Sequence, residues 1–448
     1  MTSTDVKKNR SNFFIKKISW PLFEWISFLG IFIYILSNFS FFIPSYGDAA
    51  SYSSYRWPPS FSYQPTFPFI VSFLKLTFNN RVSIYYFQSI LFFITIIILK
   101  VLLKDVAGKA ISLVSSIILL LNIRWYFYIA NPLTEVTNLF LFFFFFYFLM
   151  KSNNYWGSSN NFLIKLGYLL VTFLILLALI FNRTSNIFFA LILSLLLVLF
   201  NNHRKISIVI FLSFVTALSL HLIYNNNYNG LGLNLGHFIL ATCEKNDVQK
   251  CPEIIFNADK NSVIGKYWQA RKSLKEIENE FNVWGKEYGD EMKAVYFRLL
   301  WYAPGVFLQG VLYNWEEQIV GTYFPPYPED PNQYLLNTPL IGLLSKLSNV
   351  FAGSSILLIV FFVPIGIIYL IQYRAEPAVS LFLATLIAWI IGQFICTNTM
   401  FANLWISDAT RMRLSYEMQS LLLILFVSKL IMISLRRQGA HSLPSTIT

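Results

Sequence analysis

Residues 162–181 read FLIKLGYLLVTFLILLALIF, a run of twenty residues in which Lys165 carries the only charge. A helix of that length rises about 30 Å at ~1.5 Å per residue, which matches the hydrocarbon core of a bilayer. Nine other segments are similarly apolar, two of them shorter, so the sequence predicts ten membrane spans. They are expected over 22–43, 82–103, 108–123, 133–150, 162–181, 184–200, 206–224, 350–373, 377–397 and 414–434.

The composition of the whole chain indicates the same class. Hydrophobic residues make up 56% of its 448 residues and charged residues only 12%, with 45 Phe, 25 Tyr and a mean hydropathy of +0.56. Such values are typical of a polytopic helical membrane protein. We therefore expect an all-α fold embedded in a lipid bilayer.

Lys and Arg are unevenly divided between the two sides of the predicted spans. With the N-terminal tail in the cytoplasm, the cytoplasmic flanks collect eleven lysines and five arginines against four acids, as the positive-inside bias requires. The formal net charge of +12 is then mainly a signal of topology, and no basic, aromatic-lined soluble face indicates a nucleic-acid partner. The C-terminus carries no endoplasmic-reticulum retention signal, and we expect a multi-pass protein of a bacterial inner membrane.

This topology divides the chain into three parts. Residues 1–224 form an N-terminal membrane module whose first outer loop is 44–81, residues 225–349 form an extracytoplasmic region, and residues 350–448 form the C-terminal membrane helices. The middle part holds 14 of the 22 acids of the chain, all between Glu244 and Asp330.

Three segments are predicted to lie on the outer surface rather than to span the membrane. Residues 266–293 carry charges at helical spacing and are expected to form a solvated support or lid. Residues 295–312 are apolar enough to lie in the membrane interface, and the short amphipathic segment 65–78 is expected to lie along the outer surface.

Outside the long loop, four acids face the outer boundary: Asp48, Glu135, Asp408 and Glu417. Asp48 follows the first span, and a carboxylate at that depth can act as a base on a substrate whose other half stays in the lipid. Structural roles are equally open. Asp48 would cap a surface helix, and Glu135 would complement the positive end of the fourth span. Glu417 would pair with Arg413, four residues earlier.

The cations at that boundary are almost all arginines. A guanidinium matches two oxygens of a phosphate at once and is less costly to desolvate than an ammonium, which indicates a lipid-phosphate site. Ordinary anchoring to lipid headgroups is the alternative, and the residues alone leave both open. The set is Arg56, Arg81, Arg124, Arg183, Arg411 and Arg413, with Lys75 as the single lysine.

Cysteine and histidine contribute little to the predicted chemistry. Cys243 and Cys251 share the outer loop, where an oxidising compartment allows them to form a disulfide. Cys396 stands alone in a predicted span and is expected to be a buried apolar residue. The histidines lack paired ligand spacing, and His237 near Cys243 is a poor zinc ligand set, so we expect no metal.

Short motifs follow one another along the outer boundary. They are Gly47-Asp48 with Tyr52, Gln64-Pro65-Thr66-Phe67-Pro68, Asn131-Pro132-Leu133-Thr134-Glu135, Asn182-Arg183-Thr184, the segments 225–230 and 233–237, and Arg411-Met412-Arg413-Leu414. In this order and on this side, they resemble the motifs of the GT-C superfamily of membrane glycosyltransferases. The likeness is strongest to bacterial relatives of the protein O-mannosyltransferases and of the lipid A aminoarabinose transferases. It implies a bundle of about 10–12 membrane helices with surface helices and one large extracytoplasmic loop.

Two positions depart from the pattern of that superfamily. Many members carry adjacent acids in the first loop, whereas here Asp48 is followed by alanine, so a second carboxylate would have to come from elsewhere, with Glu135 as the candidate. The Arg-x-Arg-Leu element usually continues into proline, and here it continues as Ser415-Tyr416-Glu417. Contacts to the donor in that corner are therefore expected to differ.

The resemblance implies transfer of a sugar from a polyprenyl-phosphate donor to a glycan, lipid or protein acceptor on the extracytoplasmic face, without a cofactor or nucleotide. Asp48 would be the general base, with Glu135 as the second catalytic acid. Arg411 or Arg413, together with Arg183, would stabilise the leaving phosphate. The remaining substrate-binding candidates are Tyr52, Arg56 and Arg124.

Two other functions use similar chemistry. A transporter or flippase for a lipid-linked solute usually carries ionisable residues at the bilayer midplane and two related halves. The centres of the predicted spans hold no Asp, Glu, Lys or Arg, and no internal repeat is present. A polysaccharide polymerase or ligase shares the lipid-phosphate chemistry and stays an alternative.

Overall fold

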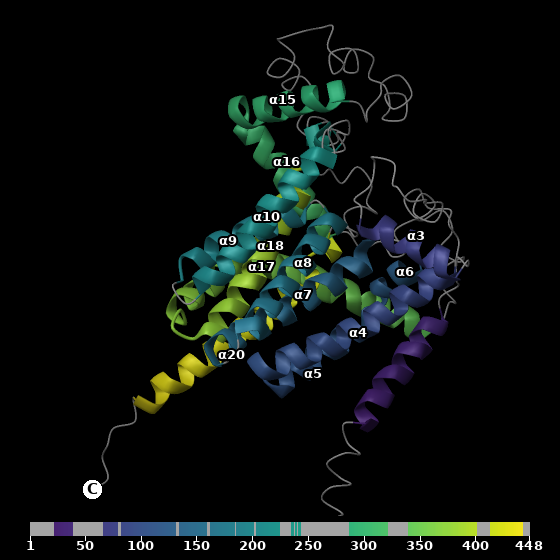
Figure 1. Cartoon of the computed structure of the whole chain (residues 1–448), viewed down its shortest axis with the longest axis vertical. Helices are drawn as coiled ribbons and strands as arrows, with labels where there is room; N and C mark the ends of the chain where they lie inside the picture. The colour runs from purple at the N-terminus through teal and green to yellow at the C-terminus, as the bar shows by residue number, and fades with distance from the viewer. Residues whose placement is uncertain are drawn as a thin grey trace, which may run out of the picture.

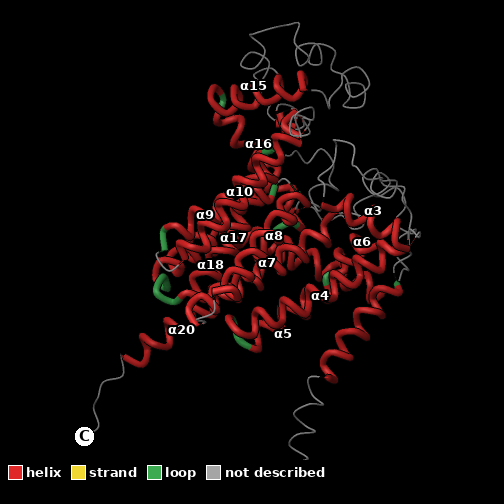
Figure 2. Tube along the Cα trace, in the orientation of Figure 1, coloured by secondary structure: helices red, strands yellow, loops and turns green. Residues whose placement is uncertain are grey.

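The computed structural model describes a bundle of helices (Figures 1 and 2). No strand occurs among the described residues, which confirms the all-α prediction. The described residues are 22–38, 66–78, 82–130, 134–158, 162–183, 185–200, 203–224, 234–236, 238–239, 241–242, 286–320, 339–400 and 413–441.

The predicted spans lie on helices of the structure, which also contains α3, α15 and α16 outside those spans. In the N-terminal part the helices are Leu22–Ser37, α3 (Thr66–Phe78), α4 (Val82–Val106), α5 (Lys109–Leu121), α6 (Ile123–Ala130), α7 (Thr134–Ser158), α8 (Phe162–Asn182), α9 (Asn186–Val198) and α10 (Arg204–Tyr224). The rest are α15 (Lys286–Tyr302), α16 (Pro304–Val320), α17 (Pro339–Gln372), α18 (Pro377–Thr399) and α20 (Glu417–His441).

Multiple membrane crossings are confirmed. Within the described ranges, six helices are long and apolar enough to cross a bilayer: α4, α7, α8, α17, α18 and α20. A seventh crossing results if the bent pair α5 and α6 is counted as one span. Two of the ten expected spans, 22–43 and 184–200, correspond to shorter helices, because the described helix there ends at Ser37 and α9 has only 13 residues. The expected span 206–224 lies on α10, which is not among the six.

The third expected span, 108–123, is broken. Helix α5 ends at Leu121, Asn122 takes an extended backbone conformation, and α6 continues at an angle of 51°. The side chain of Asn122 donates to Glu417 of α20 over 2.5 Å, so the break is held by a contact from the far end of the sequence. All eight residues of α6 are buried, although one of them is Arg124.

Helix α18 lies at the centre of the bundle, between α7, α9, α17 and α20 (Figure 1). The rings of Trp389 and Phe142 meet at 4.1 Å between centroids, and Phe189 of α9 packs against both. Gly392 permits this close approach, because a Cβ atom there would lie 2.8 Å from the backbone nitrogen of Phe189.

Charged residues assigned to the cytoplasmic flanks meet at one end of the bundle. Lys100 pairs with Glu24 at 2.5 Å, and Lys151 pairs with Asp105 at 3.9 Å. Lys429 donates to the carbonyl of Ala107 at 2.9 Å. These contacts lie near the C-terminal ends of α4 and α7, whereas the candidate acid of α7 stands in its first turn, at the opposite end.

Helices α15 and α16 stand at one end of the bundle, where α15 is carried outward on α16 (Figure 1). The helix expected within 266–293 is described only from Lys286. The apolar segment 295–312 covers the end of α15 and the start of α16, which meet at Ala303 before Pro304. Helix α3 matches the predicted surface helix 65–78.

Candidate functional site

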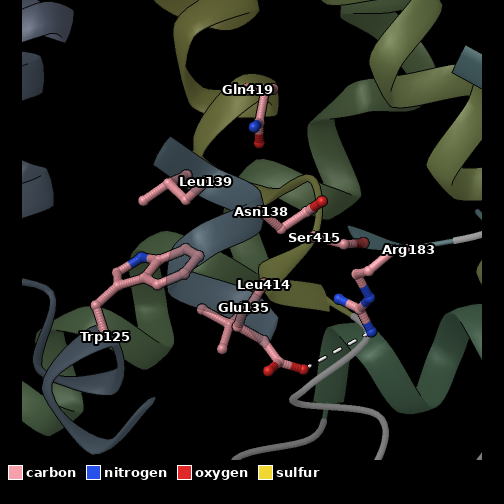
Figure 3. Close-up of a pocket in the computed structure, with 8 residues that line it drawn as sticks. All are labelled: Trp125, Glu135, Asn138, Leu139, Arg183, Leu414, Ser415 and Gln419. Atoms are coloured by element: carbon pink, nitrogen blue, oxygen red, sulfur yellow. Dashed lines mark ion pairs between the residues drawn. The ribbon is translucent and has the colours of Figure 1, made fainter. Parts of the chain in front are cut away.

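A small pocket lies where α6, the start of α7, the connection between α8 and α9, and the start of α20 come together (Figure 3). The space inside it is about 10 Å³, which is room for about one water molecule. Segments far apart in the sequence therefore build one site. The lining residues are Trp125, Glu135, Asn138, Leu139, Arg183, Leu414, Ser415 and Gln419.

One wall of the pocket carries an ion pair. Glu135 stands in the first turn of α7, at the positive end of that helix, and its side chain is buried. Arg183 follows the last residue of α8, and its Nη2 lies 3.7 Å from Oε1 of Glu135 (Figure 3). The Nη1 of Arg183 is buried without a hydrogen-bond partner, so the guanidinium still has an N–H donor to offer to a ligand.

A second charged group, the arginine cluster, consists of Arg124, Arg413 and Glu417. The Nη1 of Arg124 lies 3.3 Å from Oε2 of Glu417, and the Nε of Arg413 lies 3.7 Å from the same oxygen. All three side chains are at most 5% exposed. Neighbouring polar groups hold the two guanidiniums in place: Asn349 accepts from Arg124, and the carbonyl of Gln318 accepts from Arg413 at 2.9 Å.

The arginine cluster is not electrically balanced. Two guanidiniums share one carboxylate, and the Nε of Arg124 and the Nη2 of Arg413 are buried without hydrogen-bond partners. Burial lowers the pKa of Arg413, and the positive charge of Arg124 lowers it further, while Glu417 acts in the opposite direction. Because a buried unpaired charge is costly, an anion that reached these N–H groups would bind favourably.

The arginine cluster neighbours the pocket along the chain but does not line it. Arg413 and Glu417 flank Leu414 and Ser415, which line the pocket, and Arg124 immediately precedes Trp125, which lines it as well.

The structure brings together four of the eight residues that the sequence named. Glu135 meets Arg183, and Arg124 meets Arg413 through Glu417. The pairing of Glu417 with Arg413, expected from their spacing, is confirmed. The other named residues, Asp48, Tyr52, Arg56 and Arg411, lie outside the described residues, as does Asp408, and their roles stay predictions.

Several residues of the site were not foreseen. Sequence reasoning treated Glu417 as the partner of one arginine, whereas it serves two and also accepts from Asn122. Asn138 and Gln419 were not singled out at all, although both line the pocket. An amide among apolar residues of a predicted span is the signal that would have marked them, because such a group needs a polar partner.

The remaining chemistry-bearing residues lie apart from the pocket or outside the described ranges. Cys396 is buried with its thiol free, as predicted. Cys243, Cys251 and His237 fall outside the described residues. Within the part of the chain that is described, no three His, Cys, Asp or Glu side chains lie close enough together to hold a metal ion.

No protein-family model matches the chain, and no curated protein matches it by sequence. Similar solved structures exist. The oligosaccharyltransferase of Archaeoglobus fulgidus in its apo form is 12% identical with a TM-score of 0.44, over 96% of this chain and 53% of that chain. The archaeal oligosaccharyltransferase AglB from the same organism, in complex with an inhibitory peptide and a dolichol-phosphate, is 13% identical with a TM-score of 0.40, over 95% and 48%.

A third similar structure is ArnT from Cupriavidus metallidurans bound to undecaprenyl phosphate, which is 9% identical with a TM-score of 0.36, over 91% of this chain and 78% of that chain. The present chain spans about half the length of the oligosaccharyltransferase chains. These proteins are GT-C superfamily members, the superfamily that the motifs resemble. At these identities and scores, the likeness assigns no residue role, substrate or activity to this chain.

Proposed function

We propose that this chain is a membrane glycosyltransferase that moves a sugar from a polyprenyl-phosphate donor to an acceptor at the outer membrane boundary. The observation that carries the proposal is the arginine cluster, in which Arg124 and Arg413 share the single carboxylate of Glu417 and keep unpaired N–H groups. Phosphate is the anion whose paired oxygens fit guanidinium groups best. The ends of the apolar helices α7 and α20 would hold the lipid tail nearby.

The proposed reaction is a displacement at the anomeric carbon. Asp48 takes the proton from the acceptor hydroxyl or amine, whose oxygen or nitrogen forms a bond to that carbon with inversion. The bond between the anomeric carbon and the phosphate oxygen breaks, and the electron pair stays on the polyprenyl phosphate. The leaving phosphate gains negative charge, which the guanidiniums of Arg124 and Arg413 stabilise.

The other named residues take supporting parts in this proposal. Arg183 uses its free Nη1 to bind an oxygen of the substrate, and its pairing with Glu135 fixes its position. Arg411, Arg56 and Tyr52 contact the donor or acceptor from the outer loops. The acceptor is a glycan, a lipid or a protein, and the active site faces the extracytoplasmic side of a bacterial inner membrane.

Binding of undecaprenyl phosphate to the purified protein in nanodiscs tests the phosphate site. We expect Arg124→Gln and Arg413→Gln each to weaken binding about tenfold or more, since a hydrogen bond to a charged group is worth about 1.5–3 kcal/mol. Each of these variants leaves one arginine with one carboxylate, so the fold is expected to survive. Arg413→Lys keeps the charge but loses the planar fork and should be intermediate.

Arg374→Gln is the matched control, because Arg374 is an exposed arginine just past the end of α17. Equal binding by Arg124→Gln, Arg413→Gln and the control would move the phosphate site elsewhere. Glycan analysis of a strain that lacks the gene tests the reaction class. Loss of a single sugar supports the proposal, whereas loss of chain length alone indicates a polymerase.

A further inference from the structure

We propose that Gln318 of α16 is a positioning residue for Arg413, and that Tyr416 and Asn398 fix the place of Gln318. The inference rests on the proposed phosphate site and specifies how one of its two guanidiniums is aimed. Gln318 contacts Arg413 and acts through that arginine. All four residues are buried, with at most 1% of their surface exposed.

The guanidinium of Arg413 is held at two of its three nitrogens. Its Nη1 donates to the carbonyl of Gln318 at 2.9 Å, and its Nε lies 3.7 Å from Oε2 of Glu417. Because the group is planar, contacts at two nitrogens determine the direction of the third. The third is Nη2, which is buried and has no hydrogen-bond partner among the described residues. It is therefore the nitrogen that the two contacts aim at a phosphate oxygen.

The position of Gln318 in α16 suits its carbonyl to this contact. The last four carbonyls of a helix have no partner within that helix, and they form the negative end of its dipole. Helix α16 ends at Val320, so the carbonyl of Gln318 belongs to this set. A guanidinium is a favourable partner for such a carbonyl, because it donates a hydrogen bond and carries a positive charge.

The side chain of Gln318 fixes the end of α16 against two other segments. Its Oε1 accepts from the hydroxyl of Tyr416, and its Nε2 donates to Oδ1 of Asn398, in the last turn of α18, at 3.2 Å. One turn earlier in α16, Asn314 donates to the carbonyl of Asn398 at 3.1 Å. Rotation or sliding of α16 would break these contacts, and it would move the carbonyl that holds Arg413.

The backbone that carries Arg413 is held without Gln318. The amide of Tyr416 donates to the carbonyl of Arg413 at 3.1 Å, and Nε1 of Trp389 donates to the carbonyl of Ser415 at 2.7 Å. Loss of the Gln318 side chain is therefore expected to loosen the guanidinium and to leave the segment 413–416 in place. A loosened side chain loses more conformational entropy when a ligand immobilises it, so binding should weaken.

Binding of undecaprenyl phosphate to the protein in nanodiscs, measured in double-mutant cycles, tests the inference. Gln318→Met keeps the side-chain length and removes both side-chain hydrogen bonds, and we expect binding about fivefold weaker. Tyr416→Phe removes only the hydroxyl, and we expect binding about threefold weaker; it carries the test if Gln318→Met does not fold. In the Arg413→Gln background each change should alter binding less than twofold, because the guanidinium that is positioned has gone.

Gln393→Met is the matched control, because Gln393 is a completely buried glutamine whose Nε2 donates to Asn186 at 2.8 Å and not to the arginine cluster. It should lower the melting temperature and leave undecaprenyl phosphate binding unchanged. A purely structural role of Gln318 would give the same result.

The inference alone is overturned if Gln318→Met and Tyr416→Phe bind as the control does. It is also overturned if they weaken binding equally with arginine or glutamine at position 413, since Gln318 would then not act through Arg413. If the wild type does not bind undecaprenyl phosphate, or if Arg413→Gln binds as the wild type does, the proposed phosphate site and this inference both fail.

Discussion

The arginine cluster, Arg124, Arg413 and Glu417, and a buried relay of amides, Gln393, Asn186 and Asn138, are held together in opposite ways. In the arginine cluster, N–H donors outnumber acceptors and two positive charges meet one negative charge. In the relay of Gln393, Asn186 and Asn138, neutral amides pass hydrogen bonds from one helix to the next. An excess of buried charge indicates a place for a charged ligand, whereas a continuous neutral relay fixes the direction of one group.

The largest effect is expected when the carboxylate of the arginine cluster is removed, which tests whether the cluster holds excess buried charge. Glu417→Gln leaves Arg124 and Arg413 buried side by side without a counter-charge, and we expect a loss of about 3–5 kcal/mol in the free energy of unfolding. The melting temperature in detergent, detected by the onset of aggregation, reports this loss of stability. Removing one arginine should cost far less, because one arginine and one carboxylate remain.

Glu376→Gln is a suitable control, since Glu376 is an exposed acid at the start of α18. The double variant Glu417→Gln with Arg413→Gln should recover part of the stability lost in the single variant. If Glu417→Gln were as stable as the control, the two guanidiniums would not depend on that carboxylate, and the cluster would have no excess charge for a phosphate to neutralise.

The amide relay depends on the close approach of α9 and α18, because Asn186 of α9 accepts from Gln393 of α18. Gly392 precedes Gln393, and a Cβ atom there would lie 2.8 Å from the nitrogen of Phe189, which is backbone and cannot rotate away. We expect Gly392→Ala to lower the free energy of unfolding by about 1–3 kcal/mol, because the shift separates Gln393 from Asn186. Undecaprenyl phosphate binding should be unaffected.

Gly167→Ala provides the matched control, because a Cβ atom at Gly167 in α8 meets nothing within 4 Å. It should raise stability slightly, since alanine favours a helix over glycine by up to ~1 kcal/mol. A Gly392→Ala protein that melts at the wild-type temperature would show that the relay tolerates separation of the two helices.

The membrane class and the contact between Arg413 and Glu417 could be predicted from the sequence for a physical reason. Apolar length determines whether a helix can cross a bilayer, and that length is readable for α8 directly from 162–181. The spacing of Arg413 and Glu417 likewise predicts their contact, because residues four apart lie on one helical face.

The tertiary features of the site could not be predicted in this way. The break at Asn122 depends on a hydrogen bond to Glu417, almost 300 residues away, and local propensity does not encode such a contact. The relay joins Asn138, Asn186 and Gln393 from three helices, and one sequence does not tell which faces of those helices meet. Hydrophobic periodicity is also weak in spans that are apolar on all sides.

The smallest effect on stability is expected at His203, which belongs to neither the arginine cluster nor the amide relay. It is a buried base beside the start of α18, whereas Gln393 of the relay lies near the end of that helix. The Nε2 of His203 lies 2.9 Å from the hydroxyl of Ser380, and burial lowers the pKa of His203 from 6.5 to about 4. In the unfolded chain His203 is protonated below about pH 6.5, whereas in the folded chain it is protonated only below about pH 4. Stability is therefore lost as the pH falls through this window, by about 1 kcal/mol at pH 5.5.

Melting temperatures of the wild type and of His203→Gln between pH 7.5 and 5 measure this loss. Glutamine retains a hydrogen-bonding nitrogen for Ser380 but does not titrate, so the variant should lose less stability on acidification than the wild type does. Undecaprenyl phosphate binding at pH 7.5 should be the same in both, because His203 contacts Ser380 and not the arginine cluster. Identical pH profiles would mean that the imidazole is protonated as readily in the folded chain as in the unfolded one, so that burial of His203 would have no part in the acid sensitivity of the protein.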